Sequence, residues 1–142
     1  MRKILTIILV CGINWGFAQK AMAWQMLQLT TYQIINEGPN QGLYKPNFPS
    51  VLEKYDGEEV MISGYIIPMD IDNNSYALSM SPFSSCFFCG NAGPNTVIEL
   101  RFKEKQSKFL VDQFLMIKGI FILNENNPNA LFFKITGAEI HG

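Results

Sequence analysis

Two cysteines in the middle of the chain, Cys86 and Cys89, are the residues whose type and spacing best suit chemistry. They form a Cys-x-x-Cys pair within the run PFSSCFFCGNAGP, residues 82–94. Glycine and proline at this density interrupt a helix and predict a shaped loop. Two sulfurs this close in sequence can form a disulfide, bind a metal ion or exchange electrons. The pair therefore predicts a site in this loop.

Metal binding would use the two thiolates as half of a tetrahedral shell, which suits zinc or copper(I). The other ligands must come from elsewhere, and His141 is the single histidine of the chain. Its position next to the C-terminus is also typical of a solvated tail residue. Glu99 follows the loop among apolar neighbours, as a ligand or as part of an exposed strand face. The candidate metal ligands are Cys86, Cys89, Glu99 and His141, with Asp70, Asp72 and Glu139 as further oxygen donors.

Two chains meeting loop to loop would instead complete an all-cysteine shell in a homodimer. The plainer alternative is a disulfide between Cys86 and Cys89, which would constrain the unfolded chain by only about 2 kcal/mol. A thioredoxin-like oxidoreductase is the third hypothesis, but Gly90 and its neighbours follow the pair where a helix would be needed. Hydrolysis is disfavoured because the loop serines have no candidate base except His141. We therefore expect a binding protein rather than an enzyme.

The first residues of the chain are typical of a secretion signal. Arg2 and Lys3 precede an apolar segment that ends near Phe17, and Ala18 completes a small-residue cleavage site. The apolar segment is shorter than the roughly 20 residues that a membrane-spanning helix needs. The sequence therefore predicts a signal peptide at residues 1–18 and one exported domain, periplasmic or secreted, at residues 19–142.

The charge balance argues against nucleic acid as a partner. The chain has a net charge of −1, and removal of Arg2 and Lys3 makes it −3. Nucleic-acid binding would require clustered basic residues. The small basic run at Lys103, Lys105 and Lys108 is more typical of a solvated strand end or turn.

Apolar residues recur with the period of β-strands after residue 58. Glycines at positions 64 and 119 interrupt two of these segments, where they permit the tight coiling of a small barrel. We predict a mainly β fold with short helices, organised as a small curled OB-fold-like β-barrel, with a sandwich or half-open meander as the alternative. The five predicted strands cover residues 59–68, 75–80, 96–102, 114–123 and 130–138.

Three short helical segments are expected around this barrel. Residues 20–35 could form a short helix or an extended lead-in. Asn47 could cap a helix that has Pro49 in its first turn and continues to Tyr55. Residues 109–111 could form a helical turn in the connector before the fourth strand.

Further residues resemble an exported bacterial domain family of unknown function. The motifs that carry the resemblance are Tyr44-x-Pro46-x-Phe48-Pro49, Asp56-Gly57-x-x-Val60-x-Ile62-x-Gly64-Tyr65-x-Ile67-Pro68, and PFSSCFFCG followed by Ala92-Gly93-Pro94. The likeness covers residues 24–138. The resemblance implies secretion, a small β domain with the cysteine loop as its signature, and an association with metal-transport systems.

Two functions remain open from the sequence. The first is a periplasmic binding or accessory module whose loop holds zinc or copper(I), with a metal-transport component as its partner. The second is an interaction module in which a disulfide-braced loop docks on an envelope protein. We expect Phe83, Phe87 and Phe88 to pack the loop onto the barrel, whereas exposed rings would mark a partner surface.

Overall fold

The computed structural model describes residues 19–90, 92–107, 109–110 and 112–142, and of Cys89 it describes the backbone but not the side chain. The predicted signal peptide at residues 1–18 lies outside the described residues. Within the described part, no helix has the length and apolar character needed to cross a membrane.

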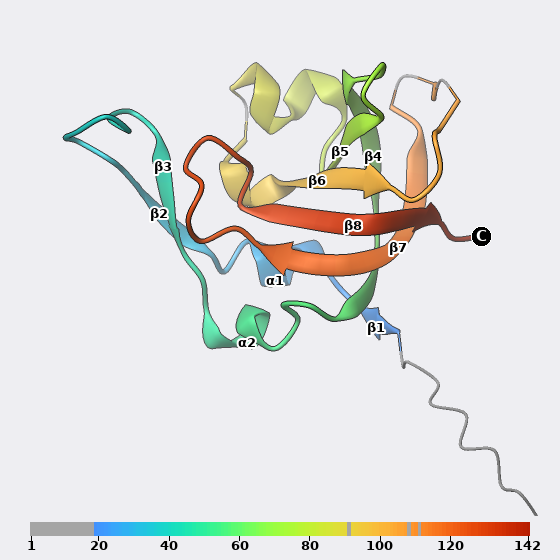
Figure 1. Cartoon of the computed structure of the whole chain (residues 1–142), viewed down its shortest axis with the longest axis horizontal. Coiled ribbons are helices and arrows are strands. Elements are labelled where there is room, and N and C mark those ends of the chain that lie inside the picture. Colours follow the sequence, from blue (N-terminus) through green and yellow to red (C-terminus); the bar gives the residue numbers. More distant parts are fainter. Residues whose placement is uncertain (1–18, 91, 108, 111) are drawn as a thin grey trace, which may run out of the picture.

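Five strands close into a barrel in the order β4-β5-β6-β8-β7, with β7 pairing back onto β4 (Figure 1). Strands β6 and β8 are parallel, whereas the other neighbours are antiparallel. This is the closed, OB-fold-like barrel that the sequence predicts, and closure excludes a sandwich or an open meander. The strands are β4 (Glu59–Asp70), β5 (Ser75–Ser79), β6 (Val97–Phe102), β7 (Phe114–Leu123) and β8 (Phe133–Ile140).

The barrel interior is filled by the alternate apolar residues of every strand. An added Cβ at Gly64 would lie 2.7 Å from the carbonyl oxygen of Ser79, and one at Gly119 would lie 2.5 Å from Cγ2 of Ile135. Glycine is therefore needed at both positions because neighbouring strands approach closely there. The largest fully buried side chains include Tyr76, Phe121, Phe133, Leu78, Ile98 and Ile135.

Two short helices cover the lower end of the barrel in Figure 1: α1 (Trp24–Leu27) and α2 (Ser50–Glu53). Each buries one leucine completely, Leu27 and Leu52. Trp24 Nε1 fixes α1 by donating a hydrogen bond to the carbonyl oxygen of Ser63 at 2.7 Å. A short strand, β1 (Lys20–Ala21), precedes α1 and runs parallel to β4. The predicted lead-in at residues 20–35 is thus part helix and part strand.

The predicted cap of the second helix is wrong. Asn47 ends a strand, and its amide donates to Oγ1 of Thr31 at 3.4 Å. Pro49 occupies the N-cap position itself, and the helix ends at Glu53 rather than continuing to Tyr55. The Asn-x-Pro spacing is compatible with either a helix start or an edge strand, because proline is tolerated in both.

A two-stranded hairpin, β2 (Thr31–Ile34) and β3 (Tyr44–Asn47), extends from the barrel as an arm (Figure 1). It was not predicted, because Pro46 lies inside β3 and argues against a strand. The predicted helical turn at residues 109–111 is also wrong for its described part. Phe109 lies outside any helix and packs against Tyr76 with ring centroids 5.1 Å apart.

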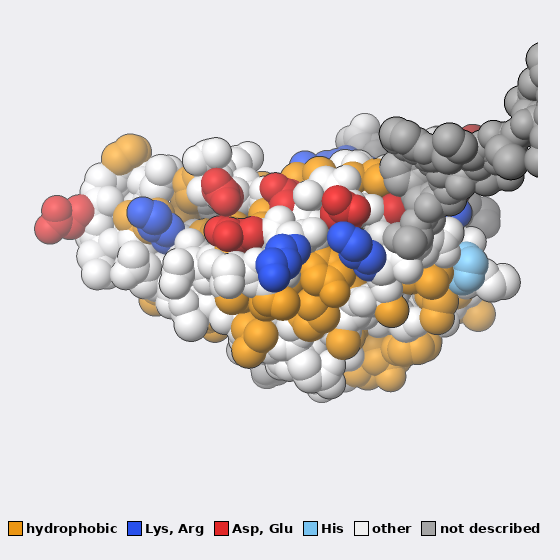
Figure 2. All heavy atoms as spheres, turned by 90° about the horizontal axis from the view of Figure 1, so that it is seen from below, with side chains coloured by type: hydrophobic (Ala, Val, Ile, Leu, Met, Phe, Trp, Pro, Cys, Tyr) orange, Lys and Arg blue, Asp and Glu red, His pale blue; other side chains and the backbone are white. Residues whose placement is uncertain are grey.

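Figure 2 shows one face of the molecule, on which acidic and basic side chains lie close together beside a hydrophobic area. Ion pairs also join charges at the strand ends. Lys103, which directly follows β6, lies 3.5 Å from a carboxylate oxygen of Glu139. The charges of this face are therefore mixed rather than gathered into a field of one sign.

Candidate functional site

The cysteine loop, residues 80–96, joins β5 to β6 through three short 3₁₀ turns: η1 (Phe83–Ser85), η2 (Phe87–Cys89) and η3 (Pro94–Thr96). Gly90 ends η2 in the left-handed conformation, with φ of 75° and ψ of 11°. The glycines and prolines of the sequence thus produce a shaped loop, as predicted.

Hydrogen bonds to residues outside the loop hold both of its ends. Near the start, the backbone N–H of Phe83 donates to Oδ1 of Asp112 at 2.7 Å. Near the end, the amide of Asn95 donates to the carbonyl oxygen of Thr30 at 3.1 Å and to that of Gln28 at 3.4 Å. The loop is therefore tied to the connector before β7 and to the segment between α1 and β2.

Cys86 lies at the centre of the loop and is fully buried. It packs with Ile67 of β4 and Ala77 of β5 in a small cluster separate from the main barrel core. A buried cysteine of this kind acts as a small hydrophobic side chain. Cys86 therefore anchors the loop against the outside of the barrel wall.

Glu99 lies beside this cluster. In the strand register Ile67 is opposite Ala77, and Ala77 is opposite Glu99, so the three side chains share the outer face of the sheet. Glu99 is only 7% exposed, and its Oε1 lies 2.7 Å from Arg101 Nε and 3.8 Å from Lys134 Nζ. The structure thus brings Cys86 and Glu99 to one face, with the carboxylate already paired to two cations.

His141 is not brought to this face. It is exposed, directly follows β8, and its backbone N–H donates to the carbonyl oxygen of Met116 at 2.8 Å. Lys134, the neighbour of Glu99, lies near the other end of β8, roughly 23 Å away along an extended strand. Among the described side chains, which exclude Cys89, no group of three metal-binding residues comes together.

The further carboxylates make local contacts of their own. Asp70 ends β4, and hydrogen bonds from the side chain and then the backbone of Asn73 lower the pKa of its carboxyl. Attraction to Lys103, together with the hydrogen bond from Lys118, lowers the pKa of Glu139. Asp72 is exposed in the turn after β4. Asp70 thus stabilises a turn, and Glu139 stabilises a strand end.

Apolar side chains are exposed beside the start of the loop. Phe83 is 50% exposed, Leu110 is 77% exposed and Phe114 is 59% exposed. Phe114 packs edge-on against Tyr65 of β4, with ring centroids 5.1 Å apart. An apolar pocket next to Phe83 is lined by Ile66, Ile67, Pro68, Phe83 and Asp112. We call Phe83, Leu110, Phe114 and this pocket the Phe83 surface.

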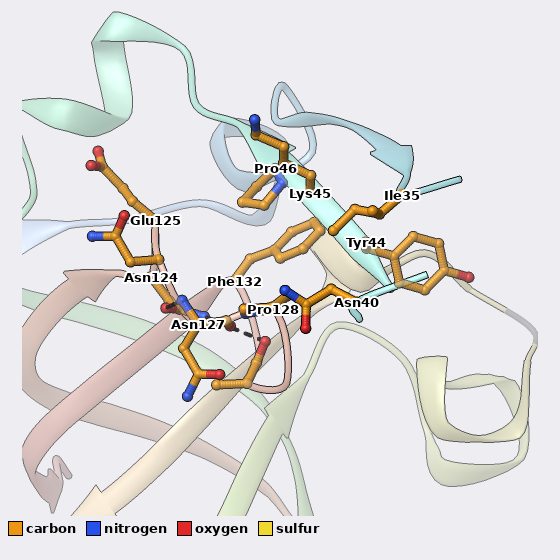
Figure 3. Close-up of a pocket in the computed structure, with 12 residues that line it drawn as sticks. Ile35, Asn40, Tyr44, Lys45, Pro46, Asn124, Glu125, Asn127, Pro128 and Phe132 are labelled. Carbon is orange, nitrogen blue, oxygen red and sulfur yellow. Dashed lines mark hydrogen bonds between the residues drawn. The ribbon is translucent and has the colours of Figure 1, made fainter. Parts of the chain in front are cut away.

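A second apolar region begins at the other side of the loop. Phe88 is 41% exposed and packs against Phe87, which in turn contacts Tyr44 of the hairpin at a centroid distance of 6.3 Å. Tyr44 and Phe132 belong to a groove between the hairpin and the loop that joins β7 to β8 (Figure 3). The groove is lined by both polar and apolar side chains. The polar ones include Asn40, Lys45, Asn124, Glu125 and Asn127, and the apolar ones include Tyr44, Pro46, Pro128 and Phe132.

The wall of this groove is rigidly built around Asn124. Its amide nitrogen donates to the carbonyl oxygens of Asn127 at 2.7 Å and Leu131 at 3.1 Å, and its Oδ1 accepts from the Asn127 N–H at 3.0 Å. The local sequence predicts only a turn here, and the groove is visible only in the structure. The sequence feature that marks the groove is the asparagine- and proline-rich turn at residues 124–129. In the structure it lines the groove together with Tyr44 and Pro46 of β3.

The outer face of β5 and β6 is buried. Ser75, Ala77 and Ser79 of β5 and Val97 and Glu99 of β6 are each at most 7% exposed. In OB-fold proteins the corresponding face and adjacent loops bind oligonucleotides and oligosaccharides. Here Cys86 of the cysteine loop packs on this face at Ala77, so the loop covers part of it.

Fold and site together define a small OB-fold-like barrel in which an elaborated loop between β5 and β6 packs onto the barrel wall. No protein-family model and no curated protein matches the chain. Among solved structures, the chain is similar to a DUF3299 family protein from Pseudomonas aeruginosa, with a TM-score of 0.57 and 15% sequence identity. The match covers 88% of this chain and 97% of that chain. At this identity the likeness shows the fold, shared with a bacterial domain of unknown function.

Proposed function

We propose that the protein is an exported interaction module that docks on an envelope protein through the Phe83 surface beside its cysteine loop. The observation that carries the proposal is the 50% exposure of Phe83 next to an apolar pocket. Exposed apolar groups that form a contiguous patch mark interaction sites more often than isolated ones do. An aromatic ring beside a pocket is also the usual form of an interface anchor.

The local backbone holds Phe83 in this exposed place. Asp112, whose carboxylate accepts the Phe83 N–H, has a φ of 54°, in the left-handed region that few residues other than glycine adopt. Aspartate is among the residues best able to adopt it. Cys86 anchors the loop three residues further along. Because the loop is already held in place, it would lose less conformational entropy when a partner binds, which favours affinity.

Comparison of two serine variants tests this proposal. Phe83→Ser removes the exposed ring, whereas Val51→Ser removes a side chain of 37% exposure on α2, away from the loop. Each should change the free energy of unfolding by less than about 1 kcal/mol, because neither side chain is in the core. An envelope extract of the native host should yield a partner with the wild type and with Val51→Ser, but not with Phe83→Ser. Equal recovery by all three proteins would contradict the proposal.

A second candidate function is a metal-binding accessory module, with zinc or copper(I) held by Cys86 and Cys89 and with a metal-transport component as partner. The observation that favours it is the backbone of the pair. Cys86 is extended, η2 turns tightly through residue 89, and Gly90 is left-handed. Such a compact turn suits two ligands spaced three residues apart. Glu99 would contribute only after release from Arg101 and Lys134, and His141 only from a rearranged tail.

Metal analysis and free-thiol counting on protein isolated without reductant or chelator test this second candidate. Stoichiometric metal that is lost in Cys86→Ser and Cys89→Ser, but retained in His141→Ala, would support a site built on the cysteine pair. Binding should weaken as the pH falls, because protons compete for the thiolates. Absence of both metal and free thiols would instead reveal the disulfide and reject the metal site.

A further inference from the structure

The hydrogen-bond register of the hairpin shows which of its backbone groups point away from it. Ile35 N–H donates to the Leu43 carbonyl oxygen at 2.8 Å, so this opposed pair is a hydrogen-bonded one. Bonded and non-bonded pairs alternate along an antiparallel ladder. Gln33 is therefore bonded to Lys45, its partner in the register. The backbone groups of Tyr32 and Ile34 point outward, along the free edge of β2.

The outward groups of Tyr32 and Ile34 have no backbone partner among the described residues. All of β2, TYQI, is exposed, including Ile34 at 54% and Tyr32 at 39%. β2 carries no charge and no proline that would discourage another strand from pairing with it. By contrast, the edge of β3 carries Lys45 and Pro46, which are the residues that natural proteins use to protect an edge.

We propose that β2 is a dimerisation edge, which pairs antiparallel with β2 of a second copy about a twofold axis at Gln33. In this register Tyr32 lies opposite Ile34 of the second copy, and the reverse pair is generated by symmetry. Their outward N–H and C=O groups then satisfy one another. An aromatic residue opposite a β-branched one is a favourable cross-strand pair. The sequence of β2 is thus complementary to itself.

Two features favour a second copy of the chain as the partner of the β2 edge: β2 has no charge, and the sheet formed by two copies has protected outer edges. Because β2 is uncharged, the Gln33 side chains meet at the axis without repulsion. The resulting four-stranded sheet, β3-β2-β2-β3, has the Lys45 and Pro46 edge on each outside, so it does not extend further. A paired edge also compensates for the low stability of an isolated two-stranded hairpin in water. The interface is small, and we therefore expect a weak, concentration-dependent dimer.

Charge variants at the axis test this register. Gln33→Lys and Gln33→Glu each place like charges directly opposite one another, which should weaken dimerisation by about tenfold or more in sedimentation equilibrium. Mixing the two variants should restore association as a heterodimer, because opposite charges then meet. Gln41→Lys and Gln41→Glu, in the exposed hairpin turn, serve as matched controls that should dimerise like the wild type.

A monomeric wild type at millimolar concentration would overturn the proposal. So would a dimer that tolerates both Gln33 variants, since its interface would lie elsewhere, or two Gln33 variants that do not recombine. Ile34→Pro gives independent support if it abolishes dimerisation while the far-ultraviolet circular dichroism stays unchanged. It removes an outward N–H and spares the bonds between β2 and β3. The proposal would also be contradicted if β2 of the wild type paired with a strand of another protein in preference to β2 of a second copy.

Discussion

Gly119→Ala should destabilise the protein, although alanine normally stabilises a strand relative to glycine. The added Cβ would lie 2.5 Å from Cγ2 of Ile135, 2.8 Å from the carbonyl oxygen of Thr136 and 3.2 Å from Cα of Ala138. Carbon atoms pack best at roughly 3.5–4.0 Å, so β7 and β8 would have to separate. Two of the three contacts are with backbone atoms, which cannot move aside as a flexible side chain can.

The expected magnitude is the difference between two effects. Crowding of a packed site by a methyl group costs about 1–3 kcal/mol. Replacing glycine by alanine recovers about 0.5–1 kcal/mol. The 2.5 Å contact places this site in the upper part of the crowding range, at about 2–3 kcal/mol. We therefore expect the free energy of unfolding to fall by about 1–2.5 kcal/mol, or the melting temperature by roughly 3–10 °C for a domain of this size. Gly119→Val should cost more, because its methyl groups crowd the same strands.

Urea unfolding followed by circular dichroism measures the change, with Gly137→Ala as the comparison. Gly137 has a φ of 57° and no atom within 4 Å of an added Cβ, so that variant reports backbone strain alone, about 1–2 kcal/mol. Gly64→Ala should resemble Gly119→Ala, since its Cβ would lie 2.7 Å from the carbonyl oxygen of Ser79. If Gly119→Ala proved neutral or stabilising, the close approach of β7 and β8, and with it the tight closure of the barrel, would be refuted.

Two further predictions concern export and acid stability. N-terminal sequencing of protein from the native host should begin at Gln19, and an intact N-terminus would contradict the predicted signal peptide. The pKa of Asp70 is lowered by hydrogen bonds from Asn73, and that of Glu139 by Lys103, relative to ordinary values of 3.8 and 4.5. Their contributions to stability are present above those values and disappear as the pH falls below them. Asp70→Asn and Glu139→Gln should therefore flatten the loss of stability in acid, whereas an unchanged pH profile would contradict these interactions.

The barrel could be predicted from the sequence because its strands carry their own signal. Alternating apolar residues define β4 to β8, and β7 begins and ends at the predicted residues, Phe114 and Leu123. The bounds of β4, β5 and β6 differ from the prediction by at most two residues, whereas β8 begins three residues later than predicted, at Phe133, and ends two later, at Ile140. Local periodicity cannot predict which strands pair, so the parallel contact between β6 and β8 appears only in the structure.

Neither the hairpin nor the spatial arrangement of the candidate metal ligands could be predicted, because both depend on strand pairing. β3 contains Pro46, whose missing N–H is harmless only because that position faces outward in the register. The proximity of Cys86 and Glu99 depends on Ala77, which neighbours both across strands. His141 lies far along β8 from this face, which no local spacing could reveal. Sequence patterns identify the chemistry of a side chain, whereas strand register decides which side chains meet.

Photo-crosslinking in the native host tests most directly whether the Phe83 surface contacts an envelope partner, as we propose. A benzoylphenylalanine probe would replace Phe83, Leu110 or, as a control on α2, Val51, all of which are exposed. We expect the same adduct from positions 83 and 110 and none from position 51. Phe114→Ser should weaken the adduct formed from position 110. No adduct from either position, or an equal adduct from position 51, would contradict the claim.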